Sequence, residues 1–371
     1  MSGPMKILVS GMSGNRGGIE SCIMNYVRNI NHRKIQFDFL CYGKNLAYEN
    51  EIIDRGGKIY HLPRRRKFIS YYQKIVSIFY ENKYDALWNN TCELGRGCVL
   101  LFKIAYEYGV PLRILHAHST GIMSMSPLHN NRIFHEMNKI CIEKYLTDYW
   151  ACSKAAGSFF YRKKIVQSPK YKIINNAIDS TSFRFDRALR DKTRKILGLD
   201  NKLVIGHVGL FHPAKNHEFL LRVFHEVCKK EPNTVLLLVG DGKLRPKIEV
   251  IVRMLNLAEN VHFLGIRSDI PELLNAIDVF VFPSNFEGLP VILIETQAAS
   301  LYNFASTNVS SATKITDHLS FVDLKKSPAE WADLILSKKY YRRSDMVEEI
   351  RKAGYDIKKE AVKLEQFFLT N

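Results

Sequence analysis

Two glutamates separated by a turn are the residues whose types and spacing best suit chemistry. The β-branched and aromatic run 279–282 predicts a buried strand, and Glu287, Gly288 and Pro290 follow it before Glu295. With Pro290 as the first helical residue, Glu295 would lie about one turn or more inside a helix, and Glu287 on the loop before it. Free amides at a helix start bind anions, and open α/β sheets bind ligands at the carboxyl ends of strands. Two carboxylates around such an anion cradle predict a nucleotide-sugar site.

A lysine at the start of another expected helix is a further candidate. A strand at 203–208 is followed by Gly209 and a short loop, and Lys215 directly precedes a helix expected at 216–230. Lysine at a helix start opposes the macrodipole, so helix stability does not explain it. The position suits a phosphate that faces both the ammonium and the helix dipole, although a solvated lysine remains the alternative.

The first glycine-rich loop follows a strand at 6–10 and ends in Gly17 and Gly18. Its spacing, G-x-x-G-x-x-G-G, differs from the dinucleotide fingerprint G-x-G-x-x-G, and no acidic residue ends the next strand at 37–41. A phosphate-binding P-loop sequence does not occur either. These patterns disfavour a dinucleotide dehydrogenase and a P-loop enzyme. They leave a loop whose backbone can approach a diphosphate, or a simple strand-to-helix turn.

Strands alternate with helices in two successive series. This alternation predicts two doubly wound parallel sheets in an α/β fold. Besides 6–10 and 37–41, the first series has strands at 86–89, 112–117, 149–151 and 172–174 and helices at 69–81, 93–108 and 131–147. The second series has strands at 203–208, 235–239, 261–264 and 279–282 and helices at 216–230, 244–256, 269–276 and 290–300. A final amphipathic helix is expected within 354–371.

Composition limits the class of protein. The hydrophobic fraction is 46%, no apolar run is long enough for a bilayer, and no secretory segment opens the chain. Seven scattered cysteines without a C-x-x-C pair disfavour a disulfide framework or zinc site, so we expect a cytoplasmic protein. Of the net charge of +17, residues 1–180 carry +13. This asymmetry suggests an anionic partner for the first half, a phospholipid surface or a phosphorylated acceptor, or else a generally basic composition.

A basic run marks the best candidate for membrane contact, formed by Arg64, Arg65, Arg66 and Lys67. It precedes a helix whose apolar stripe is expected to face the core. The stripe consists of Phe68, Tyr72, Ile75, Val76 and Phe79. Clustered cations beside aromatic residues suit anionic lipid, at about 1 kcal/mol per charge, although a solvated basic loop is the alternative.

Together these segments resemble the retaining glycosyltransferases of family 4, particularly those of bacterial exopolysaccharide and capsule synthesis. The similarity runs over most of the chain. Its motifs are Gly17-Gly18-Ile19-Glu20, Leu115-His116-Ala117-His118-Ser119, Asn176-Ala177-Ile178-Asp179, Gly209 through Lys215-Asn216, Val239-Gly240-Asp241-Gly242, Phe263-Leu264-Gly265, and Pro283-Ser284 through Glu287-Gly288-Leu289-Pro290 to Glu295.

The resemblance implies a GT-B architecture of two Rossmann-like domains facing a cleft. Residues 1–178 with the crossing helix 354–371 would form the acceptor side, and 179–353 would bind the donor. The implied reaction moves a hexosyl group from a nucleoside diphosphate sugar, UDP-sugar favoured, to a glycan or polyprenyl-diphosphate-linked acceptor. The enzyme would lie at the inner face of the cell membrane, and no nucleic acid is expected as a partner.

The resemblance also implies residue roles. Glu295 would accept hydrogen bonds from the ribose, Glu287 would face hydroxyls of the donor sugar, and Lys215 would neutralise the diphosphate. Positive charge and amide donors suit a departing diphosphate, where charge develops. Other donor contacts would come from Gly17, Gly18, Gly265, Ile266, Arg267, Gly288 and Leu289, and His118 would lie near the anomeric centre.

Retention is expected to proceed by front-side attack, with the leaving phosphate accepting the acceptor's proton. Glu287 would then position and stabilise the donor, and double displacement through Glu287 is the alternative. No Asp-x-Asp motif occurs, so we expect a reaction without metal, in which Lys215 and a helix dipole replace a cation. His116 and His118, two apart at a strand end, could instead bind metal or pack as polar groups.

Two departures from the family pattern stand out. Leu210 occupies the place of an arginine that usually pairs with the diphosphate. Either Arg267, His212 or a residue of the N-terminal domain compensates for that arginine, or the activity is weak or specialised. Residues 301–303 replace a usual Gly-Leu-Pro turn, so altered loop packing is expected there. A nucleotide-sugar 2-epimerase and a non-catalytic accessory subunit remain alternatives, the second because of Leu210.

Overall fold

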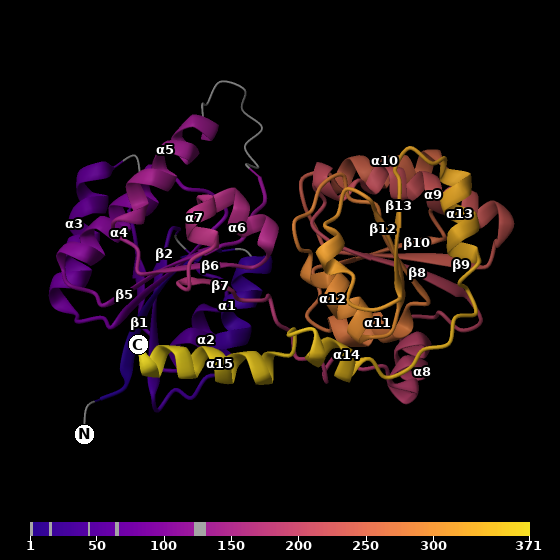
Figure 1. The fold of residues 1–371 in the computed structure, drawn as a ribbon. Coiled ribbons are helices and arrows are strands. Elements are labelled where there is room, and N and C mark those ends of the chain that lie inside the picture. The colour runs from indigo at the N-terminus through magenta and orange to yellow at the C-terminus, as the bar shows by residue number, and fades with distance from the viewer. Residues whose placement is uncertain (1–2, 15–16, 44, 64–66, 122–130) are drawn as a thin grey trace. The chain divides into compact units, whose positions relative to one another are not determined.

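The computed structural model describes residues 3–14, 17–43, 45–63, 67–121 and 131–371. The chain forms two compact units (Figure 1). The first contains residues 1–177 and 357–371, and the second contains residues 178–356. None of the helices in the described part of the chain is long and apolar enough to cross a membrane.

The described residues of the first unit form a seven-stranded parallel sheet in the order β3-β2-β1-β4-β5-β6-β7. The strands are β1 (Met5–Met12), β2 (Ile35–Cys41), β3 (Ile59–His61), β4 (Ala86–Thr91), β5 (Leu112–Ala117), β6 (Asp148–Ala151) and β7 (Tyr171–Ile173). The order reverses between β1 and β4, whose carboxyl ends therefore meet at the topological switch point of the sheet.

Helices connect these strands. They are α1 (Gly18–Asn29), α2 (Glu49–Asp54), α3 (Phe68–Glu81), α4 (Arg96–Glu107), α5 (Asn131–Glu143), α6 (Lys154–Phe160) and α7 (Lys163–Val166). The last helix of the chain, α15 (Ile357–Thr370), returns to this unit and contacts α1. Its buried residues Ile357, Ala361, Leu364 and Phe368 join the core beside Trp88 and Trp150. The predicted crossing of this amphipathic helix is confirmed.

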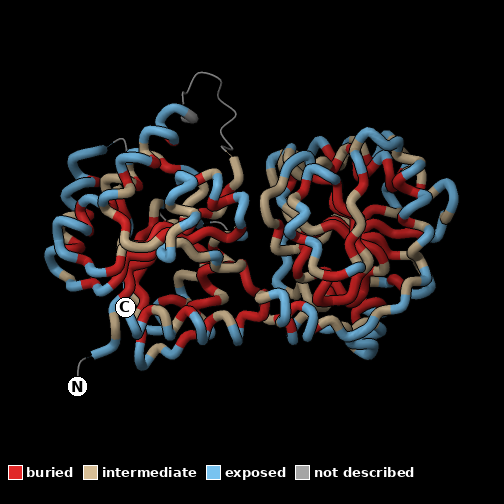
Figure 2. Tube along the Cα trace, viewed as in Figure 1, coloured by how far each residue is buried: buried red, intermediate tan, exposed pale blue. Residues whose placement is uncertain are grey.

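The described residues of the second unit form a six-stranded parallel sheet in the order β10-β9-β8-β11-β12-β13. Its strands are β8 (Leu203–Val208), β9 (Thr234–Val239), β10 (Val261–Gly265), β11 (Val279–Phe282), β12 (Tyr302–Ser306) and β13 (Leu319–Val322). The order reverses between β8 and β11. The two sheets are the most deeply buried parts of their units (Figure 2).

The helices of the second unit complete its α/β alternation. They are α8 (Arg187–Ile196), the 3-10 helix η1 (Pro213–Lys215), α9 (His217–Lys230), α10 (Arg245–Met254), α11 (Ile270–Ala276), α12 (Val291–Ala298), η2 (Ser311–Thr313), α13 (Pro328–Leu336) and α14 (Val347–Lys352). The predicted fold class of two doubly wound parallel sheets is confirmed.

The expected boundaries differ from the structure in several places. Strands β3, β12 and β13 were not predicted, and β12 begins at Tyr302, inside the segment expected to be an altered loop. The helix expected to reach residue 147 ends at Glu143. The predicted apolar stripe of α3 is also wrong in part, because Phe68 and Tyr72 are exposed. The buried row instead runs through Tyr71, Ile75, Ile78 and Phe79. Tyr71 lies about 60° around the helix from Phe68.

Candidate functional site

The predicted glutamates lie where the turn chemistry places them. Glu287 is on the loop after β11, and Glu295 is the fifth residue of α12, as expected. Pro290 is the N-cap of that helix and not its first residue, with an extended backbone at φ −69° and ψ 114°. The helix begins one residue later than expected because the turn continues through Pro290 and helical dihedrals start only at Val291.

Lys215 and Glu287 form an ion pair with 2.7 Å between Nζ and Oε1. Lys215 ends η1, which follows β8, and Glu287 follows β11, so the pair lies at the switch point of the second sheet. The ammonium also lies 4.4 Å from the ring centroid of Phe282. Both side chains are largely buried. The structure thus brings together two predicted site residues that are 72 positions apart in the chain.

Buried neutral groups surround the Lys215 ammonium. The rings of His207 and His217 lie 4.8 Å apart, and the ring of Phe211 stacks on His217 at 4.2 Å. Burial, together with the nearby Lys215 charge, lowers the pKa of His217 to about 4. Burial also lowers the pKa of His207 well below its usual value. Both histidines are therefore neutral at pH 7, and they add no competing positive charge. Neither histidine was predicted as part of the site. The position of His217 directly after the Lys215-Asn216 motif could have identified it.

Glu295 differs from Glu287 because the described residues give its carboxylate no hydrogen-bond donor or ion-pair partner. It is only partly exposed, and burial raises its pKa to about 7. A half-buried carboxyl group without donors is costly to ionise. Hydroxyl groups of a ligand would satisfy it.

Close approach of strand ends explains two glycines of this site. Gly240 has φ +127°, and a Cβ there would lie 2.1 Å from the carbonyl oxygen of Gly209. A Cβ on Gly209 would lie 3.1 Å from Cε of Lys215. Because neither position carries a side chain, the loop after β8 can pass close to Lys215.

The remaining predicted donor residues of this unit lie on two loops. Gly288 and Leu289 are partly exposed on the turn before α12. Gly265 ends β10 with φ +67°, Ile266 is exposed, and Arg267 is ion-paired with Asp269. Leu210 is also exposed, at 60%. His212 caps η1 by accepting a hydrogen bond from the amide of Ala214 through Nδ1.

In the first unit, Gly17 is the N-cap of α1 and Gly18 its first residue. The buried Glu20 accepts hydrogen bonds from the amide and hydroxyl of Ser13, at 3.2 and 2.6 Å. A Cβ on Gly17 would lie 2.7 Å from Oε2 of Glu20. Glycine at this N-cap therefore makes room for the carboxylate that ties the loop to the helix.

The two histidines at the end of β5 lie on the same side of the strand, as expected, with ring centroids 4.1 Å apart. Burial lowers the pKa of His118 to about 3, so it is neutral. Its Nε2 lies 2.9 Å from Oδ1 of Asn90 and makes a hydrogen bond there. Its Nδ1 is buried without a hydrogen-bond partner among the described residues. His118 thus holds the Asn90 amide in place.

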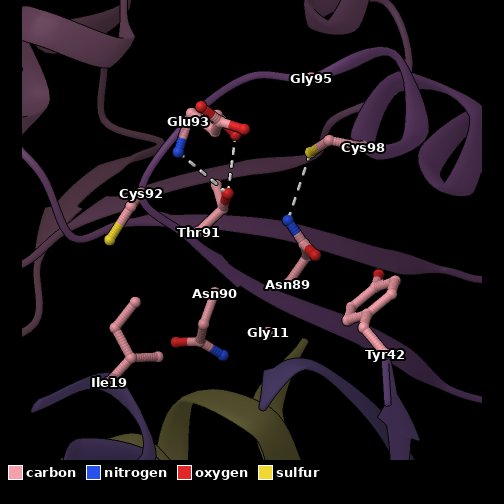
Figure 3. A pocket seen from close by; sticks show the side chains of 10 residues that line it. All are labelled: Gly11, Ile19, Tyr42, Asn89, Asn90, Thr91, Cys92, Glu93, Gly95 and Cys98. Carbon is pink, nitrogen blue, oxygen red and sulfur yellow. Dashed lines mark hydrogen bonds between the residues drawn. The ribbon is translucent and has the colours of Figure 1, made fainter. Parts of the chain in front are cut away.

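A cavity of about 250 Å³ lies at the carboxyl ends of β1 and β4, beside Asn90 (Figure 3). Its lining is Gly11, Ile19, Tyr42, Asn89, Asn90, Thr91, Cys92, Glu93, Gly95 and Cys98. Sequence reasoning missed this cavity. The signal was the polar run 89–91 at the end of an expected strand, since ligands of open sheets bind there.

Two predictions stay open. No three His, Cys, Asp or Glu side chains gather as metal ligands would in the part of the chain that the structure describes, and the metal-free reaction remains a prediction. Arg64, Arg65 and Arg66 lie outside the described residues, and Lys67 is the N-cap of α3.

Known proteins resemble this chain over most of its length. Residues 190–355, which include Lys215, Glu287 and Glu295, match the family described as glycosyl transferases group 1. The Bacillus subtilis protein EpsF, assigned as a glycosyltransferase, is 31% identical over 360 residues, covering 94% of this chain and 92% of EpsF. The chain belongs to the group 1 glycosyl transferases. The predicted family is confirmed, and the protein is a glycosyltransferase.

Two other similarities bear on this glycosyltransferase. An Escherichia coli UDP-Gal:alpha-D-GlcNAc-diphosphoundecaprenol alpha-1,3-galactosyltransferase is 26% identical, covering 72% of this chain and 70% of the relative. The crystal structure of Anabaena HepE in complex with UDP-glucose has a TM-score of 0.74 at 20% identity, covering 99% of this chain and 98% of HepE. The structural similarity confirms the predicted GT-B architecture.

Proposed function

We propose that this glycosyltransferase moves a hexosyl group, with retention and without metal, from a UDP-sugar to a lipid-linked glycan acceptor in polysaccharide synthesis. The ion pair of Lys215 and Glu287 at the switch point of the second sheet carries the proposal. A cation paired with one carboxylate, together with a second carboxylate that lacks donors on the helix that follows, suits a ligand with both a diphosphate and hydroxyl groups. The galactosyltransferase relative supports the choice of UDP-sugar and of a diphosphoundecaprenol-linked acceptor, because its name states both.

Each residue has a distinct part in the proposed reaction. Hydroxyl groups of the ribose donate to Glu295, and the ammonium of Lys215 stabilises the diphosphate as negative charge develops on it. Glu287 positions the donor sugar and orients Lys215 through their ion pair. The leaving phosphate accepts the acceptor's proton, so Glu287 need not act as a nucleophile. Backbone groups of Gly265, Ile266, Arg267, Gly288 and Leu289 border the donor, with Gly17, Gly18 and His118 in the roles that the family resemblance implies.

The test is incubation with UDP-glucose, UDP-galactose, UDP-N-acetylglucosamine and GDP-mannose. Nucleotide release is followed with and without undecaprenyl-diphosphate-linked N-acetylglucosamine as acceptor. We expect acceptor-dependent release of UDP and a product that keeps the anomeric configuration of the donor. Equal activity after EDTA treatment would support the metal-free reaction. Interconversion of the sugar nucleotide without release would favour an epimerase, and no release with any donor would contradict transferase activity.

We also propose that the enzyme acts at the inner face of the cell membrane, bound to anionic lipid through the start of α3. Phe68 and Ile69 are 61% and 71% exposed there, directly after Lys67 and the basic run of Arg64, Arg65 and Arg66. Adjacent cations and exposed apolar side chains suit the interface of an anionic bilayer.

Sedimentation with vesicles tests this association. Binding to vesicles containing phosphatidylglycerol, with little binding to phosphatidylcholine alone, is the expected result. The double variant Phe68→Ser, Ile69→Ser should bind several-fold less, while Tyr80→Ser, at the exposed other end of α3, serves as the control. Equal binding by all three proteins would contradict a role for this segment.

A further inference from the structure

A groove beside the edge strand β7 and the last helix, α15, has no assigned ligand. β7 ends the order of the first sheet, so no described strand pairs with its outer side. The groove has a volume of about 390 Å³, within the roughly 300–1,000 Å³ of small-molecule sites. All of its lining belongs to the first unit. The lining residues are Tyr26, Lys172, Ile173, Ile174, Glu360, Lys363, Leu364 and Phe367.

Most of the lining is apolar. Leu364 of α15 and Tyr26 of α1 are its most deeply buried members, at 3% and 1% exposed, and α15 packs beside α1 (Figure 1). The hydroxyl of Tyr26 already donates to the carbonyl of Asn175 at 2.8 Å, so this residue offers the groove mainly its ring. Ile174 and Phe367 are partly buried. Such a surface suits the hydrocarbon part of a ligand.

Lys172 is the charged group that lacks a partner. Its Nζ lies 3.7 Å from the ring centroid of Phe367. No carboxylate lies within 4.0 Å of this ammonium among the residues that the structure describes. Burial lowers the pKa of Lys172, and the more distant Asp148 offsets that effect only in part. A half-buried ammonium has lost hydration, and an anion in the groove would compensate for that loss.

The other two charged groups of the lining are paired with each other. Lys363 and Glu360 lie about one turn apart on α15, with 2.6 Å between Nζ and Oε1. Lys172 therefore leaves the lining with one net positive charge. A sugar ring would find few hydrogen-bond partners here, because the polar atoms of Tyr26, Glu360 and Lys363 already have partners. Charge complementarity favours a ligand with one anionic group and an apolar body.

We propose that this groove binds an amphiphilic anion, a hydrocarbon chain that ends in one carboxylate or phosphate group. The anionic group lies beside Lys172, and the chain lies along Leu364 and Ile174. Because the ligand contacts both the β7 edge and α15, its binding stabilises the packing of the last helix on the first unit. The lining contains none of the predicted donor residues, so the proposal does not depend on the transfer reaction.

Calorimetric titration of the full chain tests the proposal. The probes are octanoate and octyl phosphate, with 1-octanol as the same chain without charge and acetate as the charge without a chain. We expect octanoate, octyl phosphate or both to bind the wild-type protein at one site per chain. 1-Octanol should bind about tenfold more weakly, because it forms no charge-assisted hydrogen bond, and acetate should show no measurable binding. The two anions together show which head group the groove prefers.

Two variants locate the binding. Lys172→Met keeps an unbranched side chain beside Phe367 and removes the charge, so it should weaken octanoate about tenfold and leave 1-octanol unchanged. Ile173→Glu adds a carboxylate at a rim position that is 39% exposed, and it serves if Lys172→Met does not fold. It should also weaken octanoate. Lys338→Met is the matched control, because Nζ of Lys338 lies 4.6 Å from the ring centroid of Tyr302 in the second unit.

Thermal unfolding gives a second readout. Octanoate should raise the Tm of the wild type and of Lys338→Met, and it should raise that of Lys172→Met much less. Absence of binding by the wild type for both octanoate and octyl phosphate would overturn the proposal. Unchanged octanoate affinity in folded Lys172→Met would place the ligand elsewhere and overturn it too. Equal affinities for octanoate and 1-octanol would contradict the role of the anionic group.

Discussion

Both units have polar side chains at the switch point of their sheet, but those side chains differ in charge. At the β8/β11 switch point, Lys215, Glu287 and Glu295 are ionisable, and a carboxylate lies within 2.7 Å of an ammonium. At the β1/β4 switch point, the buried groups are the neutral amides of Asn89 and Asn90. The same topology therefore brings charged groups together at one switch point and neutral amides at the other.

The largest effect should come from removing the cation of the charged site. Lys215→Ala should lower kcat/KM for the donor about 10²- to 10³-fold, because charge developing on the diphosphate loses its stabilising group. Steady-state kinetics measure this, with Lys192→Ala, at an exposed position of α8, as the matched control. A decrease in kcat/KM of less than about threefold would contradict the proposed role of charge at this site.

A smaller effect concerns the pH dependence of stability. Burial raises the pKa of Glu295 from 4.5 to about 7, so the folded state favours its protonated form. This stabilisation is fully present below pH 4.5 and is lost as the pH rises through about 7. Glu295→Gln removes the dependence, and at pH 8 it should unfold with a free energy higher than wild type by at most about 3 kcal/mol.

Urea unfolding at pH 4.5 and pH 8 measures that difference. The variant and the wild type should converge at the lower pH. Asn89→Asp offers the comparison in the neutral site, where a new charge should lower stability at pH 8. Identical pH profiles for Glu295→Gln and wild type would show that Glu295 is not held in a costly environment.

The smallest effect concerns the glycines that let adjacent strand ends approach. Gly11 has φ +107°, and a Cβ there would lie 2.0 Å from the carbonyl oxygen of Asn90, much as Gly240 meets Gly209. Each alanine substitution should destabilise its own unit by about 2 kcal/mol through strain and overlap. Hydrogen exchange measures the stability of each unit separately. Gly109→Ala, with φ +71° but nothing within 4 Å, separates strain from overlap and should cost about half as much.

The charged site was largely predictable from the sequence, and the neutral one was not. The positions of Glu287, Glu295 and Lys215 could be predicted from local sequence patterns. Each lies near a glycine or proline that follows an apolar strand. Their ion pair could not be predicted, because it joins segments 72 positions apart in the chain. Asn89 and Asn90 lie near the end of β4 with no glycine or proline beside them, and only the order of strands places them at a switch point.

Boundaries failed for related reasons. The start of α12 shifted by one residue, because Pro290 satisfies both a helix N1 position and an N-cap. Phe68 and Tyr72 of α3 were assigned to the core because they recur at helical spacing with Ile75 and Phe79. Ile75 and Phe79 are buried as predicted, but Tyr71 and Ile78 are buried with them, and Phe68 and Tyr72 are exposed. A rotation of a helix by less than one residue is set by tertiary packing, which periodicity alone does not resolve.

Calorimetric titration with UDP tests the proposed placement of the donor beside Lys215 and Glu295 most directly. Wild-type protein and Asn89→Ala should bind UDP equally, whereas Glu295→Ala should bind it at least about tenfold more weakly, a loss of roughly 1.4 kcal/mol. Unchanged UDP affinity in Glu295→Ala would contradict the assignment of the ribose to this carboxylate, and with it the placement of the donor in the charged site.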